Sequence, residues 1–280
     1  MNHAPTVCAA LLAAALLPLP SCSTLVREDR MECPSQLNFR LVNPELVPPG
    51  GEVQIIARGE HMLQPLAWGS TTLPALADGS FRLQVPKLPE VAVYGGLGLL
   101  NGHEKEGAWV VDAGQDGDPL FRFCSRLPTL EETTLVPVEF TKEYCRITVW
   151  IVPREDAAGD CPVSLTARSH TSGIDLGSGE PVEGIYRYSP EERAPGLFTF
   201  TVPRQADESL TLELKPKPGE TQLPEAMGDI LLWPYLCRSD GFSWQLKNLP
   251  DADIELDIWR SVVHVSLTDW FTGTEIYFEL

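Results

Sequence analysis

The sequence predicts an all-β protein built of β-sandwiches, and three observations support this fold class. Short runs of alternating apolar and polar residues recur along the chain, with turn residues between them, as in half-buried strands. Proline supplies 25 of the 280 residues, and proline is excluded from helix interiors and central strands. No segment of about 12 residues or more combines helical periodicity with helix caps. Short strands joined by proline-bearing turns are typical of a β-sandwich.

The N-terminus begins with an apolar run from Val7 to Leu19 that contains no charged residue. This run is shorter than the roughly 20 residues of a membrane-spanning helix and has the length of a secretory signal. The residues that follow, Leu19-Pro20-Ser21-Cys22, resemble a bacterial lipobox, in which the cysteine thiol is acylated and the preceding peptide is removed. We therefore expect residues 1–21 to be a lipoprotein signal peptide and Cys22 to be the site of lipid attachment.

An ordinary secretory signal followed by an unmodified Cys22 is the alternative. The segment before the apolar run, Met1 to Thr6, has no Lys or Arg, whereas a signal usually opens with positive charge. In a lipoprotein, several acyl chains at about 0.8 kcal/mol per buried methylene would anchor the chain durably. Residues 22–32 are polar and charged and would form a tether between the lipid and the body.

The formal net charge of −18 excludes some classes of partner. A nucleic-acid-binding protein needs a basic face, and docking on anionic lipid head groups needs clustered Lys and Arg. We therefore expect no nucleic-acid partner, and we expect any membrane attachment to come from the N-terminal lipid.

Apolar and polar residues alternate along several segments in the first half of the chain, as in half-buried strands. Glycines at 95, 96 and 98 indicate a strand that another segment approaches closely. Turns are predicted at Pro48–Gly51 and Asp78–Gly79. A boundary near residues 127–134 divides the chain into an N-terminal sandwich, residues 33–130, and a C-terminal sandwich, residues 131–280. The expected strands lie around residues 37–41, 53–57, 81–85, 91–100, 108–111 and 120–123.

In the second half we expect a run of turns over residues 169–184, where glycine and serine dominate. The expected strands are at residues 145–151, 163–167, 198–202, 210–214, 242–246, 254–258, 263–267 and 276–280. The last of these places Ile276, Phe278 and Leu280 on one face. It is either the final strand of this protein's own sandwich or a donor strand that fills a groove in a neighbouring subunit.

Five cysteines remain after the signal and the lipid site, namely Cys33, Cys124, Cys145, Cys161 and Cys237. An odd number leaves at least one thiol unpaired within the chain, and the sequence does not choose among the possible disulfide pairings. Free cysteines are common in protein cores, so we expect buried free thiols rather than a disulfide framework.

No catalytic or metal-binding motif is present, so we expect neither an enzyme nor a cofactor. The acidic loop Asp112–Asp118 fails the spacing of a calcium loop and is expected to be solvated. The acidic residues from Asp251 to Asp257 are expected to form the wet face of a strand. His61, His103, His170 and His264 do not have the spacing of metal ligands.

The order of several short motifs resembles the FimB/Mfa2 family of fimbrial anchor subunits from Bacteroidales. The matching residues follow the lipobox and are Arg27-Glu28-Asp29, Cys33-Pro34, Leu37-x-Phe39, Tyr94-Gly95-Gly96, Leu120-Phe121, Thr141-Lys142, Ile147-x-Val149 and Asp269-Trp270.

This resemblance implies two tandem transthyretin-like β-sandwich domains. It also implies a structural subunit, lipid-anchored and surface-exposed at the cell outer membrane, that holds an adhesive fimbria by β-strand exchange. The partners would be the fimbrial stalk or other fimbrial subunits.

Two other functions remain open. The chain could be an outer-membrane surface lipoprotein that binds a ligand such as a glycan, with tryptophans as a stacking platform. The seven tryptophans mostly fall in strand patterns, so core packing explains them more simply. A secreted enzyme is the third candidate, and no motif supports it.

Overall fold

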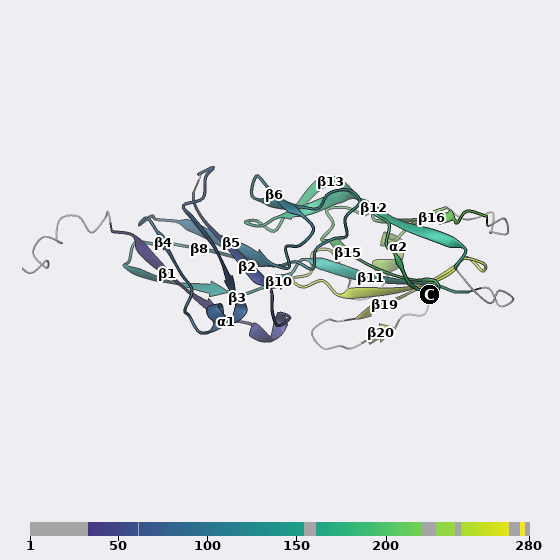
Figure 1. Cartoon of the computed structure of the whole chain (residues 1–280), viewed down its shortest axis with the longest axis horizontal. Helices are drawn as coiled ribbons and strands as arrows, with labels where there is room; N and C mark the ends of the chain where they lie inside the picture. Colours follow the sequence, from purple (N-terminus) through teal and green to yellow (C-terminus); the bar gives the residue numbers. More distant parts are fainter. Residues whose placement is uncertain are drawn as a thin grey trace, which may run out of the picture.

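The computed structural model describes residues 33–60, 62–153, 161–219, 228–238, 242–268 and 275–277. Within these ranges the strands form four sheets in an elongated body, with β1 to β5 toward one end and β16 to β20 toward the other (Figure 1). The described helices are short and comprise a 3-10 turn at Pro44–Leu46, α1 at Leu73–Ala77 and α2 at Trp233–Leu236. No described helix is long and apolar enough to cross a membrane. The all-β prediction is confirmed.

The first unit contains two sheets. A three-stranded sheet has the order β4 (Arg82–Val85), β1 (Ser35–Leu41), β9 (Thr133–Val138). A five-stranded antiparallel sheet has the order β10 (Thr141–Lys142), β8 (Phe121–Leu127), β5 (Val91–Leu97), β2 (Glu52–Gly59), β3 (Ala67–Thr72). Both sheets contribute to a single buried core, for example Phe39 from β1 and Phe123 from β8, so they form one sandwich.

The glycines of β5 allow the close approach that the sequence indicated. A Cβ atom on Gly95 would lie 1.9 Å from the backbone oxygen of Gln54, and Gly95 pairs with Ile55 on β2. Only glycine fits at this point of the sheet, because any side chain would collide with the backbone of the neighbouring strand.

The second unit repeats this plan with two larger sheets. One has the order β14 (Glu192–Ala194), β15 (Leu197–Pro203), β11 (Tyr144–Ile151), β18 (Asp251–Asp257), β19 (Val262–Thr268), β20 (Glu275–Tyr277). The other has the order β17 (Asp229–Leu231), β16 (Thr211–Pro216), β12 (Val163–Asp175), β7 (Ala108–Val110), β6 (His103–Lys105), and β13 (Pro181–Tyr188) also pairs with β12.

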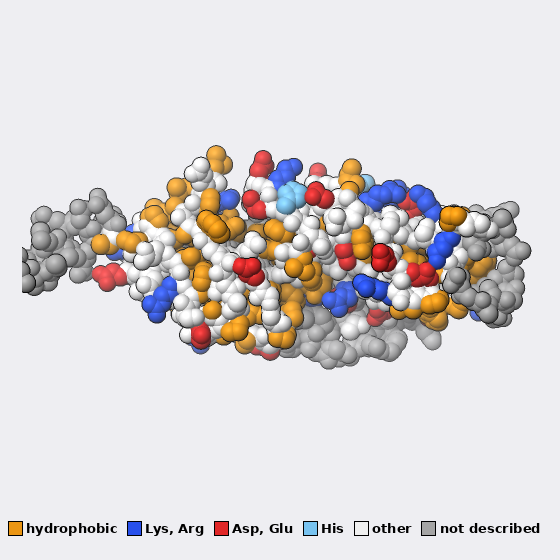
Figure 2. All heavy atoms as spheres, viewed as in Figure 1, with side chains coloured by type: hydrophobic (Ala, Val, Ile, Leu, Met, Phe, Trp, Pro, Cys, Tyr) orange, Lys and Arg blue, Asp and Glu red, His pale blue; other side chains and the backbone are white. Residues whose placement is uncertain are grey.

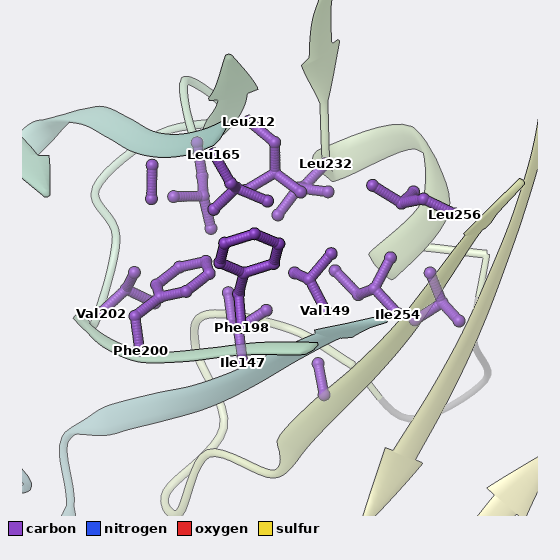
Figure 3. Close-up of a cluster of buried hydrophobic side chains, with 14 of the residues drawn as sticks. Ile147, Val149, Leu165, Phe198, Phe200, Val202, Leu212, Leu232, Ile254 and Leu256 are labelled. Atoms are coloured by element: carbon purple, nitrogen blue, oxygen red, sulfur yellow. The ribbon is translucent and has the colours of Figure 1, made fainter. Parts of the chain in front are cut away.

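The alternating residues of these strands fill the core between the two sheets. Figure 3 shows Phe198 and Phe200 from β15 and Val149 from β11 facing Leu165 and Leu212 from the opposite sheet. Each of these side chains is at most 2% exposed. Fully burying one such side chain contributes about 1.5–3 kcal/mol, which is why the period-two pattern predicts these strands well.

Among the strands that the structure describes, each unit contains one parallel pair in an otherwise antiparallel arrangement. In the first unit β1 pairs in parallel with β9, and in the second β11 pairs in parallel with β18. In both cases the first strand of the unit pairs with a strand that lies much later in the sequence. The two units therefore share an architectural plan.

Strand pairing crosses the boundary expected near residue 130 in both directions. Strands β9 and β10 follow that residue but pair with β1 and β8 of the first unit. Strands β6 and β7 precede it, and β7 pairs with β12 of the second unit. We propose that the change of unit lies at Glu143, between β10 and β11, with β6 and β7 as an extension of the first unit onto the second.

Two predictions of secondary structure were wrong. Residues 169–184 are not a run of turns, because β12 continues to Asp175 and β13 begins at Pro181. Two register irregularities let the long strand β12 bend here. Residues 242–246 form no strand: Phe242 and Trp244 are buried and meet edge to face, with ring centroids 4.8 Å apart. Both side chains anchor a loop to the core, and their burial produces the alternating pattern without a strand.

Charged side chains of both signs lie side by side over the second unit (Figure 2). Glu213 accepts a hydrogen bond from Arg187 at 2.9 Å and pairs with Lys215 at 2.7 Å. Arg168 pairs with Asp229. The Arg and Lys partners are exposed, so each pair contributes about 0–1 kcal/mol to stability. Their main effect is to neutralise the negative charge locally.

Candidate functional site

The proposed lipid site, Cys22, lies outside the described residues, as does the tether that follows it. The described body begins at Cys33, and the first strand β1 begins at Ser35. Lipid attachment at Cys22 therefore stays a prediction from the sequence.

The C-terminal strand candidate lies at the edge of a sheet. Residues Glu275–Tyr277 form β20, which pairs antiparallel with β19 and is the last strand in the order of its sheet. Ile276 lies opposite Leu267 in this ladder. Phe278 and Leu280 fall outside the described residues, so the structure places one of the three predicted donor-strand residues in a strand.

Strand β19, which pairs with β20, is firmly held by its other neighbour, β18. Strand β19 pairs with β18 over seven residues, from Val262 to Thr268, whereas it pairs with β20 over three, from Ser266 to Thr268. Val265 and Leu267 of β19 are 3% and 1% exposed and belong to the core of the second unit. A firmly held strand next to the edge of a sheet is an arrangement in which one edge strand can replace another.

A second feature near this sheet is an apolar opening of about 130 Å³ between the two sheets of the second unit. It is lined by Leu214 and Ile230 from one sheet and by Leu256 and Val263 from the other. The lining residues of β19 are Val262 and Val263, whereas the residues of β19 that pair with β20 are Ser266 to Thr268. The opening and the described part of β20 therefore lie toward opposite ends of β19.

The acidic loop after β7 is exposed from Asp112 to Gln115, as expected of a solvated loop, but its last residues are structural, which corrects the expectation there. Asp118 is 4% exposed and accepts hydrogen bonds from the backbone nitrogens of Asn101 and Gly102 and from Trp109 Nε1, at 2.6, 3.1 and 2.5 Å. Burial raises the pKa of Asp116, which accepts a hydrogen bond from the backbone nitrogen of Thr201 at 2.8 Å. Asp116 thus fastens the loop to β15 of the second unit, and Asp118 ties it to the segment around β6 and β7.

The acidic face of β18 is exposed to solvent, as predicted. Asp253 and Glu255 are exposed. Asp251 accepts a hydrogen bond from Lys142 Nζ at 2.6 Å, and Asp257 accepts one from the backbone nitrogen of Trp259 at 3.0 Å. In the described part of the chain, no three His, Cys, Asp or Glu residues are grouped as metal ligands would be.

The five cysteines Cys33, Cys124, Cys145, Cys161 and Cys237 are free thiols in the structure. Cys145 and Cys161 are buried, which confirms the expected buried free thiols, and burial raises the pKa of Cys145 to about 12. Cys33 and Cys237 are exposed.

The tryptophans do not form a stacking platform among the residues that the structure describes. Trp109 and Trp244 are buried, while Trp68 and Trp150 are 76% and 43% exposed. Trp68 lies on β3 of the first unit and Trp150 on β11 of the second, in different sheets. Core packing explains the buried tryptophans, as the sequence suggested.

A charged cluster at the junction of the units was not predicted. Glu143 accepts hydrogen bonds from Arg122 Nε at 3.2 Å and from Arg204 Nε at 2.6 Å, and its side chain is 3% exposed. Lys142 is 1% exposed and donates to the backbone oxygen of Leu249 at 2.7 Å. The partners come from distant parts of the sequence, so no local motif reveals them.

The sequence matches no family model and no curated protein. Solved structures with the same fold exist, however. The fimbrial anchor protein Mfa2 from Porphyromonas gingivalis superposes with a TM-score of 0.54 at 11% identity, covering 88% of this chain and 99% of that one.

Two proteins from Bacteroides thetaiotaomicron are similar in the same way. One, named as a candidate polysaccharide-binding protein, gives a TM-score of 0.59 at 10% identity and covers 89% of this chain and 99% of its own. The other, named as a candidate adhesin, gives a TM-score of 0.55 at 13% identity. The superposition covers 90% of this chain and 100% of that one. At these identities the similarity shows a common fold that spans almost the whole chain.

Proposed function

We propose that this chain is a non-enzymatic, lipid-anchored structural subunit of an adhesive fimbria. In this proposal it is the base anchor that holds the fimbria to the cell outer membrane through β-strand exchange with a neighbouring subunit. Its partners are the fimbrial stalk or other fimbrial subunits, and its body is exposed at the cell surface.

The observation that carries the proposal is the shared fold with a fimbrial anchor protein over nearly the full length of both chains. The superposition covers 88% of this chain, so it extends over both units. A candidate adhesin shares the same fold. The lipobox-like residues Leu19-Pro20-Ser21-Cys22 add a means of attachment to the membrane that fits an anchor.

The edge strand supports strand exchange as the mode of assembly. In β-augmentation, main-chain hydrogen bonds hold an added strand, and pockets for alternate side chains select it. Strand β20, whose described residues pair with β19, is the last in the order of its sheet, the position at which one strand can replace another. The firmly held β19 gives an incoming strand a fixed template.

The experiment that tests the proposal combines lipid labelling with a count of cell-bound fimbriae. Cys22→Ala should abolish incorporation of a fatty-acid analogue and release fimbriae into the medium. Cys33→Ala is the matched control, because Cys33 is an exposed free thiol close to the tether and should have no effect on either readout. Label retained by Cys22→Ala, or fimbriae that remain cell-bound without the lipid, would contradict the proposed anchor.

A further inference from the structure

An open cavity of about 340 Å³ lies where the first unit meets the second. Arg58 and Tyr94, from β2 and β5, belong to the first unit. The opposite wall is formed by Gly107, beside β7, and by Asp175 and Ser178 at the end of β12. A ligand in this cavity would touch both units.

Arg58 has an unpaired hydrogen-bond donor at the wall of this cavity. Its Nε atom is buried and has no hydrogen-bond partner in the part of the chain that the structure describes. The guanidinium carbon lies 5.7 Å from the centre of the Tyr94 ring, so the ring holds the cation in place. A buried donor without a partner costs free energy. Because solvent does not reach Nε, a ligand in the cavity would contact Arg58 through the Nη groups at the end of its side chain.

Gly107 leaves room beside the same guanidinium group. Its φ is +94°, and a Cβ atom at this position would lie 3.1 Å from Arg58 Nη1. The absence of a side chain keeps this side of the guanidinium accessible. The planar fork of an arginine matches the two oxygens of a carboxylate.

The rest of the lining offers hydrogen-bond acceptors and a hydroxyl group. Asp175 Oδ1 accepts hydrogen bonds from the backbone nitrogens of Gly177 and Ser178, at 2.9 and 2.6 Å, and this holds the turn in place. Glu90 pairs with Arg126 at 3.3 Å on the exposed rim. Sugar hydroxyls can donate hydrogen bonds to these carboxylates, which an inorganic anion without hydroxyl groups cannot do.

We propose that this cavity binds an acidic sugar, a hexuronate residue of a surface glycan, with its carboxylate on Arg58 and its hydroxyls on Asp175 and Ser178. The inference develops the ligand-binding alternative at a specific site. It does not depend on whether the chain anchors a fimbria.

Calorimetry on the full chain, purified in detergent, tests the proposal with three probes. Digalacturonate should bind saturably. Its neutral counterpart, the galactose disaccharide of the same linkage, should bind about tenfold more weakly or not at all, because one charged hydrogen-bonded contact is worth about a factor of ten. Triglycine carries a carboxylate without sugar hydroxyls and should not bind.

Arg58→Lys keeps the positive charge but removes the fork and should weaken digalacturonate binding about tenfold. The matched control is Arg126→Lys, which changes an exposed arginine on the rim and should alter affinity by less than about threefold. A thermal unfolding curve for each variant shows that the fold is intact.

A measurement on the unaltered protein keeps the test independent of the variants. Digalacturonate should slow the modification of Arg58 by phenylglyoxal, read by mass spectrometry, and leave the rate at exposed Arg146 unchanged. The proposal is overturned by any one of four results: no saturable binding of digalacturonate, equal binding of the neutral disaccharide, binding of triglycine, or no protection of Arg58.

Discussion

Glu143 and Arg204 form a buried ion pair, with Arg204 Nε 2.6 Å from Glu143 Oε2, at the point where the chain passes from the first unit to the second. Arg122 of β8 contacts the other carboxylate oxygen. One carboxylate thus joins a strand of the first sandwich to the residue that follows β15 of the second. The pairing fixes the two units relative to each other through groups that are almost completely removed from water.

Glu143→Gln should therefore lower the free energy of unfolding by about 3–5 kcal/mol, because it leaves two largely buried guanidinium groups without their counter-charge. Urea unfolding monitored by tryptophan fluorescence measures this. Glu139→Gln is the control, since Glu139 pairs with Lys247 at an exposed position and its loss should cost at most about 1 kcal/mol. Equal losses in the two variants would show that the buried junction pair stabilises the protein no more than an exposed pair does.

A second prediction concerns the close approach of β5 to β2. Gly95→Ala should destabilise the first unit by about 3 kcal/mol or more, because the new Cβ atom would overlap the Gln54 carbonyl oxygen and force the strands apart. Gly228→Ala is the control, because a Cβ atom there meets nothing within 4 Å, and it should change stability by less than about 0.5 kcal/mol. Thermal unfolding of both variants measures the two changes in stability.

Tyr144 makes the stability of the protein sensitive to alkaline pH. Burial raises the pKa of Tyr144 from 10.0 to about 12, and the nearby Asp251 adds to the shift. The unfolded chain loses this proton first, so the stabilisation is complete below pH 10 and disappears as the pH rises through about 12. The amount is on the order of 2–3 kcal/mol.

Tyr144→Phe keeps the ring that contacts Phe121 edge to face and removes the titrating group. The variant should lose less stability than the original protein between pH 10 and pH 12, and the two should differ little in pH dependence from pH 7 to pH 9. Urea unfolding at a series of pH values measures the difference. Parallel curves across the alkaline range would show that Tyr144 does not titrate as proposed.

The sequence predicts the strands whose side chains alternate between core and solvent, and it does so for a physical reason. In β11 the buried residues Ile147, Val149 and Ile151 face the core at every second position, so the pattern and the structure coincide. The same rule fails at Phe242 and Trp244, which alternate in burial without belonging to a strand. Two aromatic anchors in a loop produce the same short pattern.

The candidate sites depend on contacts between residues that are far apart in the sequence. Such contacts were not predictable from the sequence alone. Asp118 looks like a loop residue in the sequence, yet its partners at Asn101, Gly102 and Trp109 bury it. Arg58 and Gly107 come together only because β7 leaves the first unit to pair with β12. A lipobox, by contrast, is a local motif read by an enzyme, so the sequence alone suffices to propose Cys22.

The last prediction concerns the C-terminal strand. Deleting residues 274–280 removes β20, which pairs with β19 over three residues. The seven-residue pairing of β18 with β19 remains. The body should stay folded, with a loss of about 1–3 kcal/mol for the hydrogen bonds removed. If this strand or its neighbour joins adjacent subunits, fimbriae should detach into the medium although the truncated protein is still lipidated and at the surface.

Three measurements together distinguish a donor role from a purely internal strand. Urea unfolding shows whether the truncated body is folded, fatty-acid labelling shows whether it is anchored, and electron microscopy of cells and medium shows where the fimbriae are. A folded, labelled and surface-exposed variant that keeps fimbriae of normal length on the cell would mean that β20 only completes this protein's own sheet. Detachment under the same conditions requires a contact between subunits at this edge, because the lipid and the core of the second unit are unchanged.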